Sequence, residues 1–94
     1  MRIRSFKSKA IKLLYAEDSS KALPADAVMK LRAILTFLQD MRDASQLRNL
    51  PLWKAHQLTG DRKEVWSLSV TRNWRLTFRI VEREIVDVDY EDYH

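Results

Sequence analysis

Hydrophobic residues recur at helical spacing in the first half of this chain and alternate with polar residues in the second half, and the change falls at Leu50 and Pro51. A period near 3.6 residues indicates amphipathic helices, whereas strict alternation indicates strands with one buried and one wet face. The pattern therefore predicts an α+β protein in which N-terminal helices cover the apolar face of a sheet.

The first half predicts one short strand and two helices. Residues 3–6 could form the strand, and residues 8–17 carry apolar side chains at helical spacing. The second helix should begin near Pro24, whose fixed φ suits a first helical turn, and Asp26 complements the positive end of the helix dipole. It should end at residues 43–45. Its apolar stripe consists of Ala27, Val28, Leu31, Ile34, Leu35, Leu38 and Met41.

The second half predicts a sheet. Residues 52–58 are expected to form a strand, followed by a turn at residues 60–63. Apolar and polar residues then alternate over residues 66–70, 74–80 and 86–90, which predicts three more strands.

The register of the two hairpins follows from burial, because a one-residue slip would turn the apolar side chains of a strand toward solvent. In the first hairpin, this rule places Leu68 opposite Leu76, with a loop at residues 71–73. In the second, it places Ile80 opposite Val86, with a loop at residues 82–84. The remaining apolar pairs are Trp66 with Phe78, Val70 with Trp74, Phe78 with Val88 and Leu76 with Tyr90.

The same register predicts an open polar face, with Arg75 near its middle and Arg72 at its rim. The expected polar pairs are Ser69 with Arg75, Ser67 with Thr77, Arg79 with Asp87 and Arg75 with Glu91. The alternation assigns Trp66 and Trp74 to the core, and Trp53 less firmly. Stacking on nucleic-acid bases is the alternative role for these rings.

Composition limits the classes of protein that fit. Ninety-four residues and a 46% hydrophobic content suit one domain, expected to span residues 1–94. The net charge of +4 favours a polyanionic partner, nucleic acid or an acidic protein, although such a charge also serves solubility alone. The lack of cysteine excludes disulfides and thiolate metal sites. With no membrane-spanning run and no signal peptide, a cytoplasmic location is expected.

Arg75 is the first candidate for chemistry, because its guanidinium offers a rigid fork of donors suited to phosphate. A cross-strand ion pair with Glu91 is the structural alternative. The second candidate is the tail, where Asp92, Tyr93 and His94 bring three proton-moving side chains together. A frayed and inert terminus is the alternative there.

His56 is a third candidate, on one side of a predicted strand with Lys54, although a lone histidine in a strand is often structural. A basic rim for an RNA backbone could be formed by Lys54, Arg62, Lys63 and Arg72. A solvated surface would show the same residues.

No phosphate-binding glycine loop, nucleophile elbow or metal-ligand spacing occurs in the sequence, so no cofactor or metal is expected. An enzyme of this composition would work with arginine, lysine, histidine, tyrosine and carboxylates. RNA cleavage can proceed on such a set, because the 2′-hydroxyl of the substrate is itself the nucleophile. The protein must remove its proton, neutralise the phosphate and protonate the leaving oxygen.

Three ordered blocks, residues 52–62, 66–78 and 89–94, resemble the HigB toxins, or plasmid maintenance proteins, of the RelE-like superfamily. Residues 2–14 also resemble the opening strand and helix of that family. The resemblance implies two N-terminal helices against a curved, mainly antiparallel sheet. It implies an mRNA endonuclease acting in the 30S A site of the ribosome. It also implies a helix-turn-helix antitoxin, HigA-like, with which a monomeric toxin would form a hetero-oligomer.

The resemblance also implies roles for individual residues. Arg75 matches the phosphate-facing arginine of the block that contains Asn73, which is expected to bind RNA, and His56 matches the histidine of the first block. Asp92, Tyr93 and His94 match the acid, tyrosine and histidine at the end of the third block. His94 or Asp92 would take the proton, Tyr93 would orient or donate, and His56 would help to protonate or position.

Two positions depart from the family's pattern, because Thr59 and Thr71 stand where the family is expected to carry basic residues. Arg72 lies beside Thr71 and could substitute for the missing charge, so the departure bears on the strength of substrate binding.

Two other functions remain open. A degenerate relative could bind antitoxin or ribosome without cutting RNA. A duplex-DNA-binding protein fits less well, since no helix carries a dense basic face.

Overall fold

The computed structural model describes residues 1–93, so His94 lies outside the described residues. The elements in chain order are β1 (Arg2–Ile3), α1 (Lys9–Glu17), α2 (Ala25–Asp40), α3 (Ser45–Arg48), η1 (Leu52–Lys54), β2 (His56–Gln57), η2 (Gly60–Arg62), β3 (Val65–Ser69), β4 (Trp74–Val81) and β5 (Glu84–Asp92), where η marks a 3₁₀ turn. The strands form one sheet in the order β1-β5-β4-β3-β2. Only β1 pairs in parallel with its neighbour, and the other strand pairs are antiparallel.

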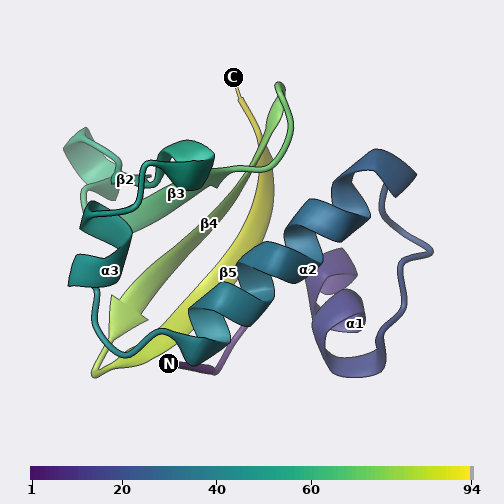
Figure 1. Cartoon of the computed structure of the whole chain (residues 1–94), viewed down its shortest axis with the longest axis horizontal. Helices are drawn as coiled ribbons and strands as arrows, with labels where there is room; N and C mark the ends of the chain where they lie inside the picture. Colours follow the sequence, from purple (N-terminus) through teal and green to yellow (C-terminus); the bar gives the residue numbers. More distant parts are fainter. Residues whose placement is uncertain (94) are drawn as a thin grey trace.

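Helices α1 and α2 lie on one side of the sheet, with α2 running across it and α1 beside it (Figure 1). Leu31 and Ile34 of α2 are fully buried, as are Leu76 of β4 and Val88 of β5. Burial of one such side chain stabilises a fold by about 1.5–3 kcal/mol. The predicted layer of helices on the apolar sheet face is therefore confirmed.

The helix boundaries follow local capping. Helix α1 begins after Ser8, whose hydroxyl accepts the backbone N–H of Ile11 at 3.2 Å. Helix α2 ends at Asp40, a few residues earlier than predicted, because Met41 adopts an extended conformation with ψ 137°. The chain then forms the short helix α3, whose Leu47 is fully buried.

The strand predicted over residues 52–58 is wrong except at its last part, because only His56 and Gln57 pair with β3. Trp53 and Lys54 have φ angles of 63° and 49°, which turn the chain instead of extending it. The turn brings the ring of Trp53 edge-on to Phe37 of α2, with the ring centroids 5.8 Å apart. Each left-handed residue costs roughly 1–2 kcal/mol, and packing of the Trp53 ring against Phe37 offsets the cost of the two.

The other two tryptophans lie on the helix-covered face of the sheet. Trp66 is a core residue with 4% exposure, as predicted. Trp74 is only half-buried, and its ring stacks on Tyr90 with a centroid distance of 4.7 Å. Trp74 is thus a border residue of the core.

The predicted register is confirmed for β3 with β4, including Leu68 opposite Leu76, and for the distal part of β4 with β5, including Leu76 opposite Tyr90. Near the second turn the prediction is wrong by one residue, since Ile80 pairs with Ile85 instead of Val86.

The one-residue difference between the predicted and the observed register arises from a turn that is shorter than predicted and from a β-bulge that compensates for it. The turn has two residues, Glu82 and Arg83, with φ angles of 51° and 65°, the left-handed pair that suits the twist of a hairpin. An extra residue on β5 then restores the register at Asp87, which has a φ of 56°. The Asp87 backbone N–H donates to the Ser5 hydroxyl at 2.9 Å, and its carboxylate still meets Arg79, at 2.8 and 3.0 Å.

The turn gives a first testable expectation. Replacing Arg83 by glycine should raise the free energy of unfolding by about 0.5–1 kcal/mol. A left-handed conformation costs an L-residue about 1–2 kcal/mol, and glycine avoids this cost. Part of the gain is cancelled because the unfolded chain has more conformational entropy with glycine. Urea unfolding measures the change. The exposed Arg42 has no positive φ, so Arg42→Gly should lower the stability or leave it unchanged. A loss of stability in Arg83→Gly would contradict the turn geometry.

Within residues 1–93, no helix has both the length and the apolar character that crossing a bilayer requires.

Candidate functional site

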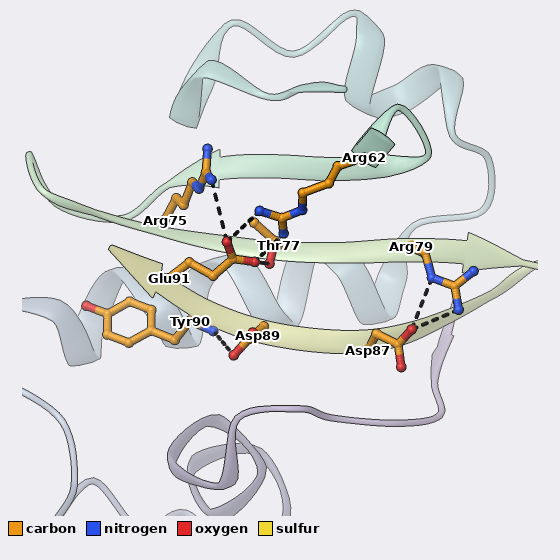
Figure 2. A network of polar contacts seen from close by, with 8 residues as sticks. All are labelled: Arg62, Arg75, Thr77, Arg79, Asp87, Asp89, Tyr90 and Glu91. Carbon is orange, nitrogen blue, oxygen red and sulfur yellow. Dashed lines mark hydrogen bonds and ion pairs between the residues drawn. The ribbon is translucent and has the colours of Figure 1, made fainter. Parts of the chain in front are cut away.

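The face of the sheet opposite the helices carries polar side chains from strands β2 to β5. The pleat and the register bring Arg75 and Thr77 of β4 beside Glu91 of β5, and Figure 2 shows these side chains on the same side of the sheet, together with Arg62 from η2. The Arg75 side chain is 15% exposed, so it is largely enclosed but still reachable from solvent. Arg75 therefore lies within the polar face, as the alternation predicts, but this face is less open than predicted, because Ser67 and Thr77 are buried.

Glu91 is the most highly bonded group on this face. Arg62 donates to its two carboxylate oxygens at 2.9 and 2.5 Å, and the Thr77 hydroxyl donates to Oε2 at 2.5 Å (Figure 2). These donors, Arg62 first, lower the pKa of Glu91 from 4.5 to about 2, against the opposing effect of burial. The same hydrogen bond raises the pKa of Arg62 above its ordinary value. Arg62, expected on an open basic rim, is engaged with a carboxylate.

The Arg75 guanidinium keeps donor capacity that the described residues do not use. Its contact with Glu91 is long, 3.5 Å from Nη2 to Oε1, and its Nε is buried without a hydrogen-bond partner. Its planar group also lies over the ring of Tyr93, 5.2 Å from the centroid. The cross-strand pair with Glu91 thus exists in register but is weak, because Arg62 holds that carboxylate. An anion at the exposed edge of Arg75 would meet guanidinium Nη donors that Glu91 engages only weakly.

The tail is fixed as far as Tyr93. The Tyr93 backbone N–H donates to the carbonyl of Asn73 at 2.9 Å, and its hydroxyl lies 2.6 Å from the hydroxyl of Ser69. Asp92 pairs with Trp74 at the last step of β5, so the pleat assigns it to the other face of the sheet. The structure therefore brings Tyr93 and Arg75 together and sets Asp92 one step away.

His56 occupies the edge of the same polar face, because it lies opposite Ser67, which in turn lies opposite Thr77. The ring is exposed, and Nδ1 lies 2.7 Å from the carbonyl oxygen of Lys54. A ring nitrogen at this distance from a carbonyl carries the hydrogen. Nε2 is thus the nitrogen that can exchange a proton with a ligand.

Two of the predicted basic residues, Lys54 and Arg72, meet at a hollow of about 520 Å³. The lining residues of this hollow, called here the basic hollow, are Lys30, Lys54, Ser69, Val70, Thr71, Arg72 and Tyr93. Lys63 and Asn73 are exposed and are not among its lining residues.

Two residues of the site were not predicted from the sequence. The register could have indicated Glu91, which faces Arg75. No signal in the sequence indicates Lys30, because its position in the helix pattern is that of an ordinary solvent-exposed lysine.

Among residues 1–93, no three histidine, aspartate or glutamate side chains gather in a geometry that could hold a metal ion.

This architecture, helices on one side of a mainly antiparallel sheet and an arginine-centred polar face on the other, defines a RelE-like α+β fold. The YoeB/ParE toxin from Agrobacterium tumefaciens superposes with a TM-score of 0.62 at 17% identity, over 100% of both chains. A chain of the E. coli DinJ-YafQ toxin-antitoxin complex gives a TM-score of 0.60 at 17% identity, covering 98% of this chain and 93% of that one. At such identities the likeness shows the fold alone.

The sequence identifies the family. The profile of the family described as "RelE-like toxin of type II toxin-antitoxin system HigB" matches residues 4–94. The Endoribonuclease HigB of Proteus vulgaris is 36% identical over 92 residues, which cover 98% of this chain and 99% of the relative. The chain belongs to the HigB-like toxin family, and the resemblance seen in the three sequence blocks is confirmed.

Proposed function

We propose that this protein is an endoribonuclease toxin that cleaves messenger RNA on the ribosome, without a metal ion, through the 2′-hydroxyl of the substrate. The observation that carries the proposal is the placement of Arg75, a partly exposed guanidinium that Glu91 contacts only at 3.5 Å, on one sheet face with Tyr93 and His56. The name of the Proteus vulgaris relative supports the same reaction class.

The reaction needs a base, a group that neutralises the phosphate and a proton donor, and we assign these roles to residues of this face and of the C-terminal tail. Arg75 neutralises the phosphate as negative charge develops in the transition state. A base, His94 or Asp92, removes the 2′-hydroxyl proton, so that O2′ attacks phosphorus and the bond to the 5′-oxygen breaks. His56, through Nε2, is placed to protonate or position the leaving oxygen, and Tyr93 orients the phosphate. The products are a 2′,3′-cyclic phosphate and a 5′-hydroxyl end.

The proposal assigns two partners. The Arg75 side chain is only 15% exposed, so a ribosome that presents single-stranded mRNA in its 30S A site would supply the substrate alignment that the bare chain lacks. The protein would therefore act in the cytoplasm. A helix-turn-helix antitoxin of the HigA type would neutralise the monomeric toxin in a hetero-oligomer, as toxin and antitoxin associate in the similar DinJ-YafQ complex.

Ribosome assays with defined mRNA test the reaction. Toxin stripped with EDTA and returned to ribosome buffer should cut mRNA at an unchanged rate, and only when ribosomes are present. Mapped ends should be a 5′-hydroxyl and a cyclic or 3′-phosphate. One 2′-deoxynucleotide at the cleaved position should stop cleavage, because the nucleophile is missing.

The outcomes separate the alternatives. A 5′-phosphate end, or cleavage that survives the 2′-deoxy substitution, would contradict the 2′-hydroxyl route. Growth arrest without new RNA ends would favour the degenerate relative that binds ribosome or antitoxin only.

A further inference from the structure

The basic hollow gathers cations from three separate segments of the chain. Lys30 comes from α2, Lys54 from η1 and Arg72 from the loop between β3 and β4, and no carboxylate is among its lining residues. All three side chains are exposed, and none forms an ion pair within residues 1–93. Uncompensated positive charge in a concave surface favours an anionic ligand.

Other hollows on the molecule differ in charge. The hollow between α1 and α2 contains Arg32 with Asp18 as an ion pair, and the small hollow on the polar sheet face sets Arg62 and Arg79 among three carboxylates. The hollow lined by Glu64 also mixes signs, and the hollow at the start of α1 sets three lysines, at positions 7, 9 and 12, beside Glu17. Of these hollows, the basic hollow is the one whose lining has cations and no carboxylate.

Helix periodicity explains why Lys30 faces this hollow. Lys30 and Phe37 are seven residues apart, so they lie on the same side of α2. Phe37 packs against Trp53, the neighbour of Lys54 in η1. The contact holds η1 against that side of α2, and Lys30 projects beside the same segment two turns earlier.

The hollow adjoins the proposed reaction centre through Tyr93. Tyr93 lines the hollow, its hydroxyl lies 2.6 Å from that of Ser69, and its ring lies under the Arg75 guanidinium. An RNA strand with one phosphate at Arg75 would therefore carry a neighbouring phosphate into the basic hollow.

We infer that Lys30 is an RNA-binding residue that, with Lys54 and Arg72, binds a backbone phosphate next to the one that is cleaved. Helix α2 then forms one wall of the RNA site, beside the sheet and its loops. The inference rests on the proposed function and names a further contact of that site. Because the contact is to the backbone, it adds affinity without base preference.

Binding of RNA by the isolated protein tests the inference. The probe is a short fluorescent single-stranded RNA with one 2′-deoxy position, so that it is not cut, and anisotropy is measured over a range of KCl concentrations. Lys30→Ala should weaken binding about three- to tenfold and lower the slope of log affinity against log salt by about one ion. Lys30→Arg should retain most of the affinity. In the ribosome assay, Lys30→Ala should raise KM and leave kcat nearly unchanged.

Lys21→Ala is the control, because Lys21 is an exposed lysine before α2 that lines neither the basic hollow nor any of the other hollows described above. It should bind RNA like the unmodified protein. Equal losses in both variants, or an unchanged salt slope in Lys30→Ala, would overturn the inference. Normal RNA binding by Lys30→Ala with a weaker antitoxin complex would also overturn it and assign the hollow to the antitoxin. Failure of the proposed cleavage would show as uncut mRNA with every variant, which leaves the binding comparison intact.

Discussion

Replacing Arg75 by alanine is expected to abolish growth arrest and to slow mRNA cleavage by about 10²- to 10³-fold, the usual cost of removing one positioned donor from a transition-state anion. The guanidinium of Arg75 is the more weakly engaged of the two that meet Glu91, because Arg62 holds that carboxylate at 2.9 and 2.5 Å and Arg75 contacts it at 3.5 Å. Lysine at this position should restore little, because a point charge does not reproduce a planar fork.

The fold should survive this change. Glu91 keeps its hydrogen bonds from Arg62 and Thr77 when Arg75 is absent, so no buried carboxylate is left without donors. Tyr93 keeps its backbone bond to Asn73. Thermal melting of Arg75→Ala should therefore stay close to that of the unmodified protein, and the loss of cleavage would be chemical.

Arg79→Ala is the control for this prediction. Arg79 lies four residues further along β4, on the same face, but both of its hydrogen bonds go to Asp87. Its removal should leave cleavage nearly unchanged. Single-turnover cleavage on ribosomes measures both variants. An Arg75→Ala protein that still arrests growth, or an Arg79→Ala protein that loses as much, would show that phosphate charge is neutralised elsewhere.

Alternation predicts the part of the fold in which one face of a strand is buried and the other is wet. It correctly placed Arg75 opposite both Ser69 and Glu91. It failed at the second turn because two arrangements satisfy the same pattern. A three-residue loop with a regular strand, and a two-residue loop with a bulge at Asp87, give Leu76 the same partner. Burial of the apolar side chains determines the register of β4 with β5 far from the turn. It does not determine whether the extra residue lies in the loop or in a bulge of β5.

The features that sequence reasoning could not supply come from contacts between distant segments. The engagement of Arg62 with Glu91 joins residues 29 positions apart, and each taken alone reads as a surface charge. The turn at Trp53 depends on the ring of Phe37, sixteen positions earlier in α2. Lys30 reaches the basic hollow only because α2 packs against η1. In each case tertiary packing overrides or supplements a local pattern.

The carboxylate of Glu91 should make this protein acid-sensitive in a specific pH range. Its pKa is about 2 in the fold, against an ordinary value of 4.5, chiefly because Arg62 donates to it. A carboxyl whose pKa is lowered by folding stabilises the fold above its unfolded pKa, and that stabilisation is lost as the pH falls toward the folded pKa. The contribution should therefore be complete above about pH 5 and decline between pH 4.5 and 2. Its size should be about 1–3 kcal/mol, since each unit of pKa corresponds to about 1.4 kcal/mol and partial exposure reduces the effect.

Glu91→Gln should lower the free energy of unfolding by that amount at pH 7, and the difference from the unmodified protein should shrink toward zero near pH 2. Urea unfolding at a series of pH values gives the difference, and NMR titration of the Glu91 side chain gives its pKa directly. Arg62→Ala should move that pKa back toward 4.5, because the main hydrogen-bond donor is gone. Glu84→Gln is the matched comparison, since Glu84 meets two exposed arginines at 3.6 and 3.2 Å and such surface pairs contribute about 0–1 kcal/mol. If Glu91 titrates near 4.5 in the unmodified protein, its engagement with Arg62 does not hold in solution, and the donors of Arg62 would join those of Arg75 on the open face.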